Sequence, residues 1–131
     1  MFLGSCLNNC SPEEANSFLR EKFATKEKYL NRLVKEMDFL TTHEYFSDEL
    51  MGRVYFDSIF DKDMSLNKMK QDAEVETIYS NKQSQLHLSF GYCSASATNL
   101  IYSTVPVEEI NKPRIQVFKL KTNWYGEILF P

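Results

Sequence analysis

Residues 11–41 form the longest uninterrupted apolar periodicity in the chain and limit what it can fold into. Ser11 is a typical helix N-cap, Pro12 suits the first helical position, and Glu14 is spaced to close a capping box with Ser11. Apolar side chains then recur at helical spacing, at Ala15, Leu19, Phe23, Leu30, Leu33, Val34, Met37 and Leu40. The sequence therefore predicts one long helix over 11–41, after a short lead-in at 1–10.

Most of the remaining chain is patterned as strands. Alternation and turn residues predict strands at 53–60, 75–80, 85–94, 100–107, 114–120 and 124–130. In the strand at 85–94, alternation should place Leu86, Leu88, Phe90 and Tyr92 on one face. The small polar residues 95–99 predict a loop, and Asp63 or Ser65 is expected to cap a short helix that bears Leu66 and Met69.

These elements predict an α+β fold, in which one long N-terminal helix packs on an antiparallel meander of about four to five strands. The chain has 131 residues, of which 43% are hydrophobic and 25% charged, and this suits one domain over 1–131. Within it, 1–10 is the lead-in, 11–41 the helix and 53–130 mainly strands. The element order resembles the outline of cystatin-like folds. That resemblance is carried by no motif and implies a fold only.

Charge is unevenly distributed along the chain. The net charge of −3 argues against a general nucleic-acid-binding protein. From Glu36 to Asp63 there are eight acids and two bases, whereas from Arg20 to Lys35 there are six bases and two acids. One interpretation is two solvated faces that partly neutralise each other. The other is an acidic docking face for a basic protein partner, for which we name Asp48, Glu49, Asp57 and Asp61.

The chain has three cysteines, Cys6, Cys10 and Cys93. Leu3-Gly4-Ser5-Cys6 resembles the end of a bacterial lipoprotein signal, which would place a lipid on Cys6. Such a signal also needs a charged start and an apolar run of about 7–15 residues, which this sequence does not contain. If the true start lies upstream, Cys6 would carry lipid and Cys10 and Cys93 would be free to form a disulfide. As the sequence stands, we expect a cytoplasmic protein; the alternative is the bacterial envelope.

Candidate catalytic and metal-binding patterns are weak. His87 and Cys93 would share a strand face but lie roughly 20 Å apart at strand rise, which is too far for a catalytic pair. Asp61, Asp63, Ser65, Asn67 and Asp72 have calcium-loop spacing, but Leu66 occupies the position that needs glycine. Phosphate-binding loops and metalloprotease motifs are absent from the sequence. We therefore expect no catalytic residue, metal or cofactor.

These observations favour a non-enzymatic protein-binding module, such as an inhibitor, an immunity protein or an adaptor. The chain also has ten Phe and seven Tyr, more aromatic residues than one helix can cover, and these could add to the binding surface. One alternative is a small apolar ligand held between helix and sheet by Tyr and Trp side chains. Another is an envelope lipoprotein anchored through Cys6. No stretch is long and apolar enough to predict a membrane span.

Overall fold

Helix α2 (Pro12–Thr42) begins at the capping box that the sequence predicts. The computed structural model describes residues 10–42, 48–50, 53–80 and 85–131. The backbone N–H of Glu14 donates to Ser11 Oγ at 3.1 Å, and the N–H of Ser11 donates to Glu14 Oε1 at 3.2 Å. Each side chain thus satisfies a backbone donor that the helix itself leaves unpaired. The predicted helix is confirmed.

One face of α2 forms the core with the sheet. Seven of the eight predicted core residues of the helix are buried: Ala15, Leu19, Phe23, Leu30, Leu33, Val34 and Met37. The side chain of Leu40 lies outside the described residues. Opposite the helix, Trp124 is 3% exposed, packs against Phe23 at 5.4 Å between ring centroids, and donates from Nε1 to Asn31 Oδ1 at 3.2 Å. Trp124 is therefore a core residue and not the wall of a ligand cavity.

The strands form a single antiparallel sheet, which confirms the α+β prediction. In sheet order they are β1 (Asp48–Leu50), β2 (Arg53–Tyr55), β3 (Thr77–Ser80), β4 (Leu86–Cys93), β5 (Ser96–Tyr102), β8 (Trp124–Leu129), β7 (Ile115–Lys121) and β6 (Ile110–Lys112). Eight described strands exceed the predicted four to five because β1, β2 and β6 are only three residues long. Such short strands leave little alternation for a sequence to display.

The order of strands changes after β5. Strands β1 to β5 are sequential neighbours, and the chain then crosses to the far edge with β6 and returns through β7 to β8. The connection before β6 lies against the sheet face opposite α2, where the backbone N–H of Val107 donates to Tyr125 Oη at 3.2 Å. Ile101, Val117 and Tyr125 form a second, smaller apolar cluster there. Both faces of this part of the sheet are therefore covered.

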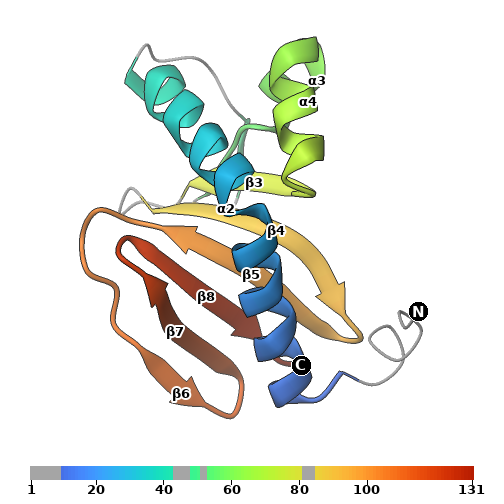
Figure 1. Cartoon of the computed structure of the whole chain (residues 1–131), viewed down its shortest axis with the longest axis vertical. Coiled ribbons are helices and arrows are strands. Elements are labelled where there is room, and N and C mark those ends of the chain that lie inside the picture. Colours follow the sequence, from blue (N-terminus) through green and yellow to red (C-terminus); the bar gives the residue numbers. More distant parts are fainter. Residues whose placement is uncertain (1–9, 43–47, 51–52, 81–84) are drawn as a thin grey trace.

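Two short helices join β2 to β3. Helix α3 (Asp57–Lys62) replaces the second half of the strand predicted at 53–60, so that prediction is wrong beyond Tyr55. Phe56 and Phe60 are both buried, and their helical spacing turns both toward the core. Helix α4 (Met64–Asp72) confirms the predicted short helix, with Asp63, of the two predicted candidates, as its cap, and Leu66 is buried on it. Figure 1 shows α2 crossing the sheet and continuing beyond it, beside α3 and α4.

The loop predicted at 95–99 is wrong. The turn after β4 contains only Ser94 and Ala95, and Ser94 adopts a φ of 60°, which lets the chain reverse in two residues. Thr98 and Asn99 then continue β5 and are fully or almost fully buried. Their polar groups find partners within the sheet, with Thr98 Oγ1 donating to the Gly91 carbonyl at 3.2 Å. Satisfied hydrogen bonds make polar side chains compatible with a central strand.

Candidate functional site

The four acids proposed to meet a partner belong to two elements at one end of the sheet. Asp48 and Glu49 are on the edge strand β1, and Asp57 and Asp61 are on α3. Strand β1 pairs with β2, and α3 begins two residues after β2 ends. The Asp61 side chain is exposed, while the side chains of Asp48, Glu49 and Asp57 lie outside the described residues. The fold thus brings together the elements that carry these acids.

A row of aromatic rings starts at this edge and runs into the sheet. In the backbone register Asp48 is opposite Tyr55, Tyr55 is opposite Tyr79, and Tyr79 is opposite His87. The rings of Tyr55 and Tyr79 are 5.3 Å apart between centroids, and those of Tyr79 and His87 are stacked at 4.8 Å. Cross-strand aromatic pairs of this kind stabilise a sheet and hold its side chains in fixed orientations.

The aromatic row lies on the face of the sheet opposite α2. The strand neighbours of Tyr79 and His87, which are Ile78 and Leu88, belong to the core that α2 covers. Successive strand residues point to opposite faces, so Tyr79 and His87 point away from α2. Burial there is nevertheless high, with Tyr79 7% and His87 6% exposed. Only part of the surface of these rings is therefore exposed to solvent.

Beside this row is a surface cleft of about 340 Å³, which we name the tyrosine cleft. Its walls come from β2, β3, β4, β5 and β8, and its lining residues are Tyr55, Glu76, Thr77, Tyr79, Ser89, Gly91, Tyr92, Ala97, Asn99 and Leu129. Three tyrosines, two hydroxyl residues, an amide and a carboxylate therefore surround one volume. This combination can bind a polar or charged group by hydrogen bonds while contacting it with apolar ring surface.

A buried polar group forms part of the cleft. Asn99 is 3% exposed, and its Nδ2 donates to Glu127 Oε1 at 2.9 Å. The same Glu127 oxygen lies 3.5 Å from His87 Nδ1. Within the described part of the chain, no hydrogen bond is made to Oδ1 of Asn99. Asn99 is thus oriented by Glu127 and retains an acceptor at a cleft-lining position.

A β-bulge places Glu76 and Tyr92 at the cleft. The pairing of β4 with β5 shifts register between Ser89 and Tyr92, and Gly91 adopts a φ of +88°. The N–H of Gly91 donates to Ser89 Oγ at 3.1 Å, and a Cβ on Gly91 would fall on the Glu76 carboxylate. The prediction that Tyr92 shares a face with Phe90 is wrong, because a bulge resets the alternation. Tyr92 is 70% exposed and lines the tyrosine cleft.

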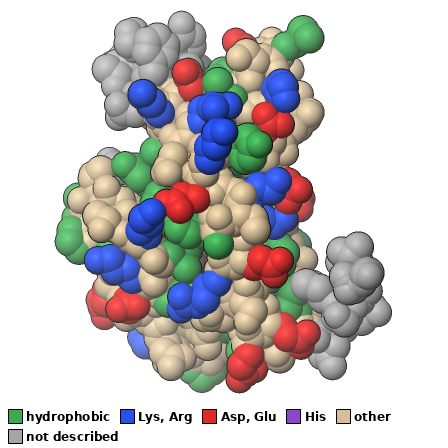
Figure 2. All heavy atoms as spheres, in the orientation of Figure 1, with side chains coloured by type: hydrophobic (Ala, Val, Ile, Leu, Met, Phe, Trp, Pro, Cys, Tyr) green, Lys and Arg blue, Asp and Glu red, His purple; other side chains and the backbone are tan. Residues whose placement is uncertain are grey.

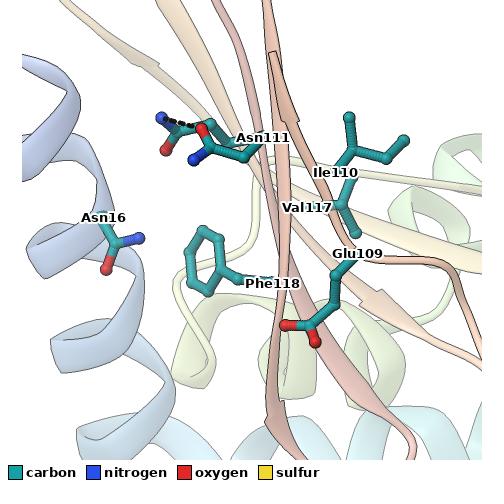
Figure 3. A pocket seen from close by; sticks show the side chains of 7 residues that line it. Asn16, Glu109, Ile110, Asn111, Val117 and Phe118 are labelled. Carbon is teal, nitrogen blue, oxygen red and sulfur yellow. Dashed lines mark hydrogen bonds between the residues drawn. The ribbon is translucent and has the colours of Figure 1, made fainter.

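A second cleft, of about 370 Å³, lies between α2 and the β6–β7 hairpin (Figure 3). Asn16 and Phe118 face each other across it, but the Arg20 guanidinium covers the Phe118 ring at 4.7 Å and donates to Asn16 Oδ1 at 2.6 Å. Glu109 Oε1 accepts the backbone N–H of Lys119 at 2.9 Å. Asn16, Phe118 and Glu109 are thus already in contact with neighbouring groups, so this cleft is less suited to a ligand than the tyrosine cleft.

Two lysines on the basic side of α2 form ion pairs with Glu74, which lies outside the acidic run at 36–63. Lys22 donates a hydrogen bond to Glu74, which follows α4, and Lys26 Nζ lies 3.5 Å from the same carboxylate. The hydrogen bond from Lys22 is the main reason that the pKa of Glu74 is lowered, with the charges of both lysines acting in the same direction. Figure 2 shows Lys and Arg side chains interspersed with acids on this face. These contacts fix α2 against the end of α4.

The structure joins Cys10 and Cys93 in a disulfide, the pairing considered from the sequence. Their Cα atoms are 5.6 Å apart although the residues are 83 positions apart in the chain. The bond attaches the start of α2 to the end of β4, so Cys93 is not a catalytic thiol. Cys6, the candidate lipid attachment site, lies outside the described residues.

Among the described residues, no three His, Cys, Asp or Glu side chains are grouped as metal ligands. None of the described helices has the length and apolar character to cross a membrane. Sequence reasoning missed Glu76, Gly91 and Asn99, because only strand pairing brings them together. Comparison with models of protein families, with curated proteins and with solved structures found no match.

Proposed function

We propose that this chain is a non-enzymatic protein-binding module whose contact surface comprises the tyrosine cleft, β1 and α3. One observation carries the proposal: the register Asp48–Tyr55–Tyr79–His87 joins the strand that bears two of the acids to the row of aromatic rings. Tyrosines next to acidic residues suit a partner with a basic, partly apolar surface. The partner is therefore expected to be a basic protein.

The proposal is tested by comparing two sets of acids. The triple variant D48N/E49Q/D61N removes three charges from β1 and α3, whereas E13Q/E21Q/E108Q removes three charges from exposed residues elsewhere. Asp57 is left unchanged because α3 has only six residues, and the carboxylate at its first residue would be a larger share of its stability than Glu13 is for the 31-residue α2. A partner captured from the source organism with the unmodified chain is purified and used with all three proteins.

Association rates are then measured by surface plasmon resonance at low and high salt. We expect D48N/E49Q/D61N to associate several-fold more slowly at low salt, and the difference to shrink as salt screens the charges. The control variant should associate at the unmodified rate. Equal rates for all three proteins at low salt would show that these acids are only a solvated surface.

The disulfide favours a second proposal, that the protein is an envelope lipoprotein anchored through Cys6. Disulfides form and persist mainly in oxidising compartments such as the bacterial periplasm, and the Cys10–Cys93 bond leaves Cys6 as the remaining cysteine. Mass spectrometry of the protein from its own cells should find a lipid on Cys6 and none in a Cys6→Ser variant. An unmodified Cys6 thiol in protein from the membrane fraction would refute this anchor.

A small apolar ligand is supported less well than a protein partner. The interface of α2 with the sheet is filled by apolar side chains, including Trp124. The tyrosine cleft carries Glu76 and Asn99, whose polar groups would lose hydrogen bonds to water beneath a purely apolar molecule. The chemistry of the cleft therefore favours a polar or charged group.

A further inference from the structure

We propose that the tyrosine cleft receives an arginine side chain of the protein partner. This inference rests on the proposed protein-binding function and specifies the group that the partner inserts.

The charge of the cleft favours a cation. Glu76 contributes a carboxylate to the lining, and none of the lining residues is Lys or Arg. A second carboxylate, that of Glu127, binds Asn99 from the adjacent strand and is only 12% exposed. The lining therefore carries one net negative charge, and the exposed Glu76 carboxylate can pair with a bound cation.

The acceptors of the cleft match a donor-only group. Glu76 offers two carboxylate oxygens, and Asn99 has an Oδ1 that accepts no hydrogen bond within the described part of the chain. A guanidinium carries five N–H donors in a fixed plane and no acceptor, so it can donate to several oxygens at once. A lysine ammonium is a compact, more strongly hydrated charge and lacks this planar arrangement.

The aromatic surface that is available also suits a planar cation. Both faces of the Tyr79 ring are occupied, one by Tyr55 and the other by His87, so Tyr79 contributes its edge to the cleft. Tyr92 is 70% exposed on the bulge and has ring surface free for stacking. Guanidinium groups stack on such rings, and desolvation strengthens the contact. The volume of about 340 Å³ is large enough for one side chain and its neighbouring backbone.

The absence of a side chain at Gly91, in the bulge, leaves room for the Glu76 carboxylate. Because Gly91 has no Cβ, the Glu76 carboxylate can lie against the backbone of β4 at the rim of the cleft. The bulge also turns Tyr92 onto the same face of the sheet. One local irregularity thus supplies both the carboxylate and the stacking ring that an arginine would use.

The inference is tested on the complete chain by NMR titration with the blocked tripeptide Gly-Arg-Gly. The matched probe contains citrulline, which has the shape of arginine without its charge. We expect saturable shifts at the backbone N–H of Gly91 and the side-chain amide of Asn99 with the arginine peptide. Citrulline should produce no saturable shift, and a lysine peptide should bind several-fold more weakly.

Variants then assign the contact to the cleft. Glu76→Gln and Tyr92→Ala, both at exposed positions, should each weaken arginine-peptide binding about twofold to fivefold, the effect of losing an exposed ion pair or a stacked ring. Glu108→Gln removes an exposed carboxylate that does not line the cleft and should leave binding unchanged. Two-dimensional spectra of each variant verify that it is folded.

Three results would overturn the inference: equal binding of arginine and citrulline, equal binding of arginine and lysine, or unchanged affinity in folded Glu76→Gln. The titration uses no partner protein, so its outcome is separate from that of the association experiment above. Arginine binding in the cleft together with unchanged association of D48N/E49Q/D61N would refute the acidic docking face alone. The reverse pair of results would refute the arginine site alone.

Discussion

The carboxylate of Glu76 lies against the backbone of Gly91, in the space that any other residue at position 91 would fill with its Cβ. Gly91 also adopts a φ of +88°, in the left-handed region that side chains other than hydrogen disfavour. Two constraints therefore act at this bulge: the backbone conformation favours glycine, and the Glu76 carboxylate, at the end of a flexible side chain, would have to move to admit a Cβ. One arises from the backbone, and the other from a neighbouring charged side chain.

Gly91→Ala should lower the free energy of unfolding by about 1–3 kcal/mol, measured by urea denaturation. Part of this loss comes from backbone strain and part from displacing Glu76. In a Glu76→Ala background the same substitution should cost less, because only the strain remains. An equal cost in both backgrounds would show that Glu76 moves aside freely. Glu76→Ala alone should change stability by no more than about 0.5 kcal/mol.

Loss of the Cys10–Cys93 disulfide should destabilise the fold. The bond closes a loop between residues 83 positions apart, and C10A/C93A should lower the free energy of unfolding by about 2–4 kcal/mol. Alanine is chosen because Cys93 is only 1% exposed, where a serine hydroxyl would add its own cost. Cys6→Ser is the matched control. If it lost as much stability as the double variant, the Cys10–Cys93 pairing would be wrong in solution.

The ion pairs of Glu74 predict a dependence of stability on pH. The folded-state pKa of Glu74 is lowered, mainly by the hydrogen bond from Lys22, so its contribution is present above the unfolded pKa of about 4.3. It is lost as the pH falls through the folded pKa. Because about half of this side chain is exposed, solvent screens the pairs, and Glu74→Gln should cost only about 0.2–1 kcal/mol at pH 7.

Thermal or urea unfolding at a series of pH values checks this expectation. The difference between the unmodified chain and Glu74→Gln should disappear once the carboxyl is protonated in both states. A difference that persisted at low pH would assign the effect to packing or to the backbone, since Glu74 has a φ of 59°.

Asp63 and Asp61 should differ in their effects on stability. Asp63 caps α4 by accepting the backbone N–H groups of Ser65 at 2.9 Å and Leu66 at 3.0 Å. Asp63→Ala should therefore cost about 0.5–2 kcal/mol in a denaturant titration. Asp61→Ala, at an exposed position on α3, should stay within about 0.5 kcal/mol of the unmodified chain. A large effect of Asp61→Ala would give this acid a structural role instead of the proposed binding role.

Local signals in the sequence were sufficient for the long helix and for several strands. The capping box at Ser11 and the apolar stripe of α2 depend only on residues a few positions apart, and both are confirmed. The cap of α4 by Asp63 was predictable for the same reason. Strand β8 (Trp124–Leu129) also lies almost where alternation placed it, at 124–130.

The wrong predictions fall where distant residues decide the local structure. Polar residues at the start of β5 resemble a loop until Gly91 and Glu127 are seen to satisfy Thr98 and Asn99. Residues after Tyr55 fit a strand by alternation, and the spacing of Phe56 and Phe60 places both on one face in a strand or in a helix, so their burial fits either element. Competition between two periodicities in so short a segment is settled by tertiary packing.

The candidate site likewise combines features that the sequence indicates locally with features that depend on distant residues. Charge counts alone directed attention to Asp48, Glu49, Asp57 and Asp61, and the structure places them on β1 and α3. The tyrosine cleft depends on the register that sets Tyr55 beside Tyr79 and on the bulge that brings Glu76 to Gly91. Neither can be inferred from one sequence, because a shift of one residue in register would turn these side chains to the other face.

The Cys10–Cys93 bond also determines how the molecule would bear tension. A pull applied upstream of Cys10 and at the C-terminus would pass through the disulfide directly into Cys93 and on to strands β5 to β8. Helices α2, α3 and α4 and strands β1 to β4 would lie outside the loaded path, because they fall between the two cysteines. If the chain were tethered at Cys6 and pulled at its C-terminus, tension would therefore act only on the C-terminal strands. The intact disulfide would keep the rest of the chain from being extended.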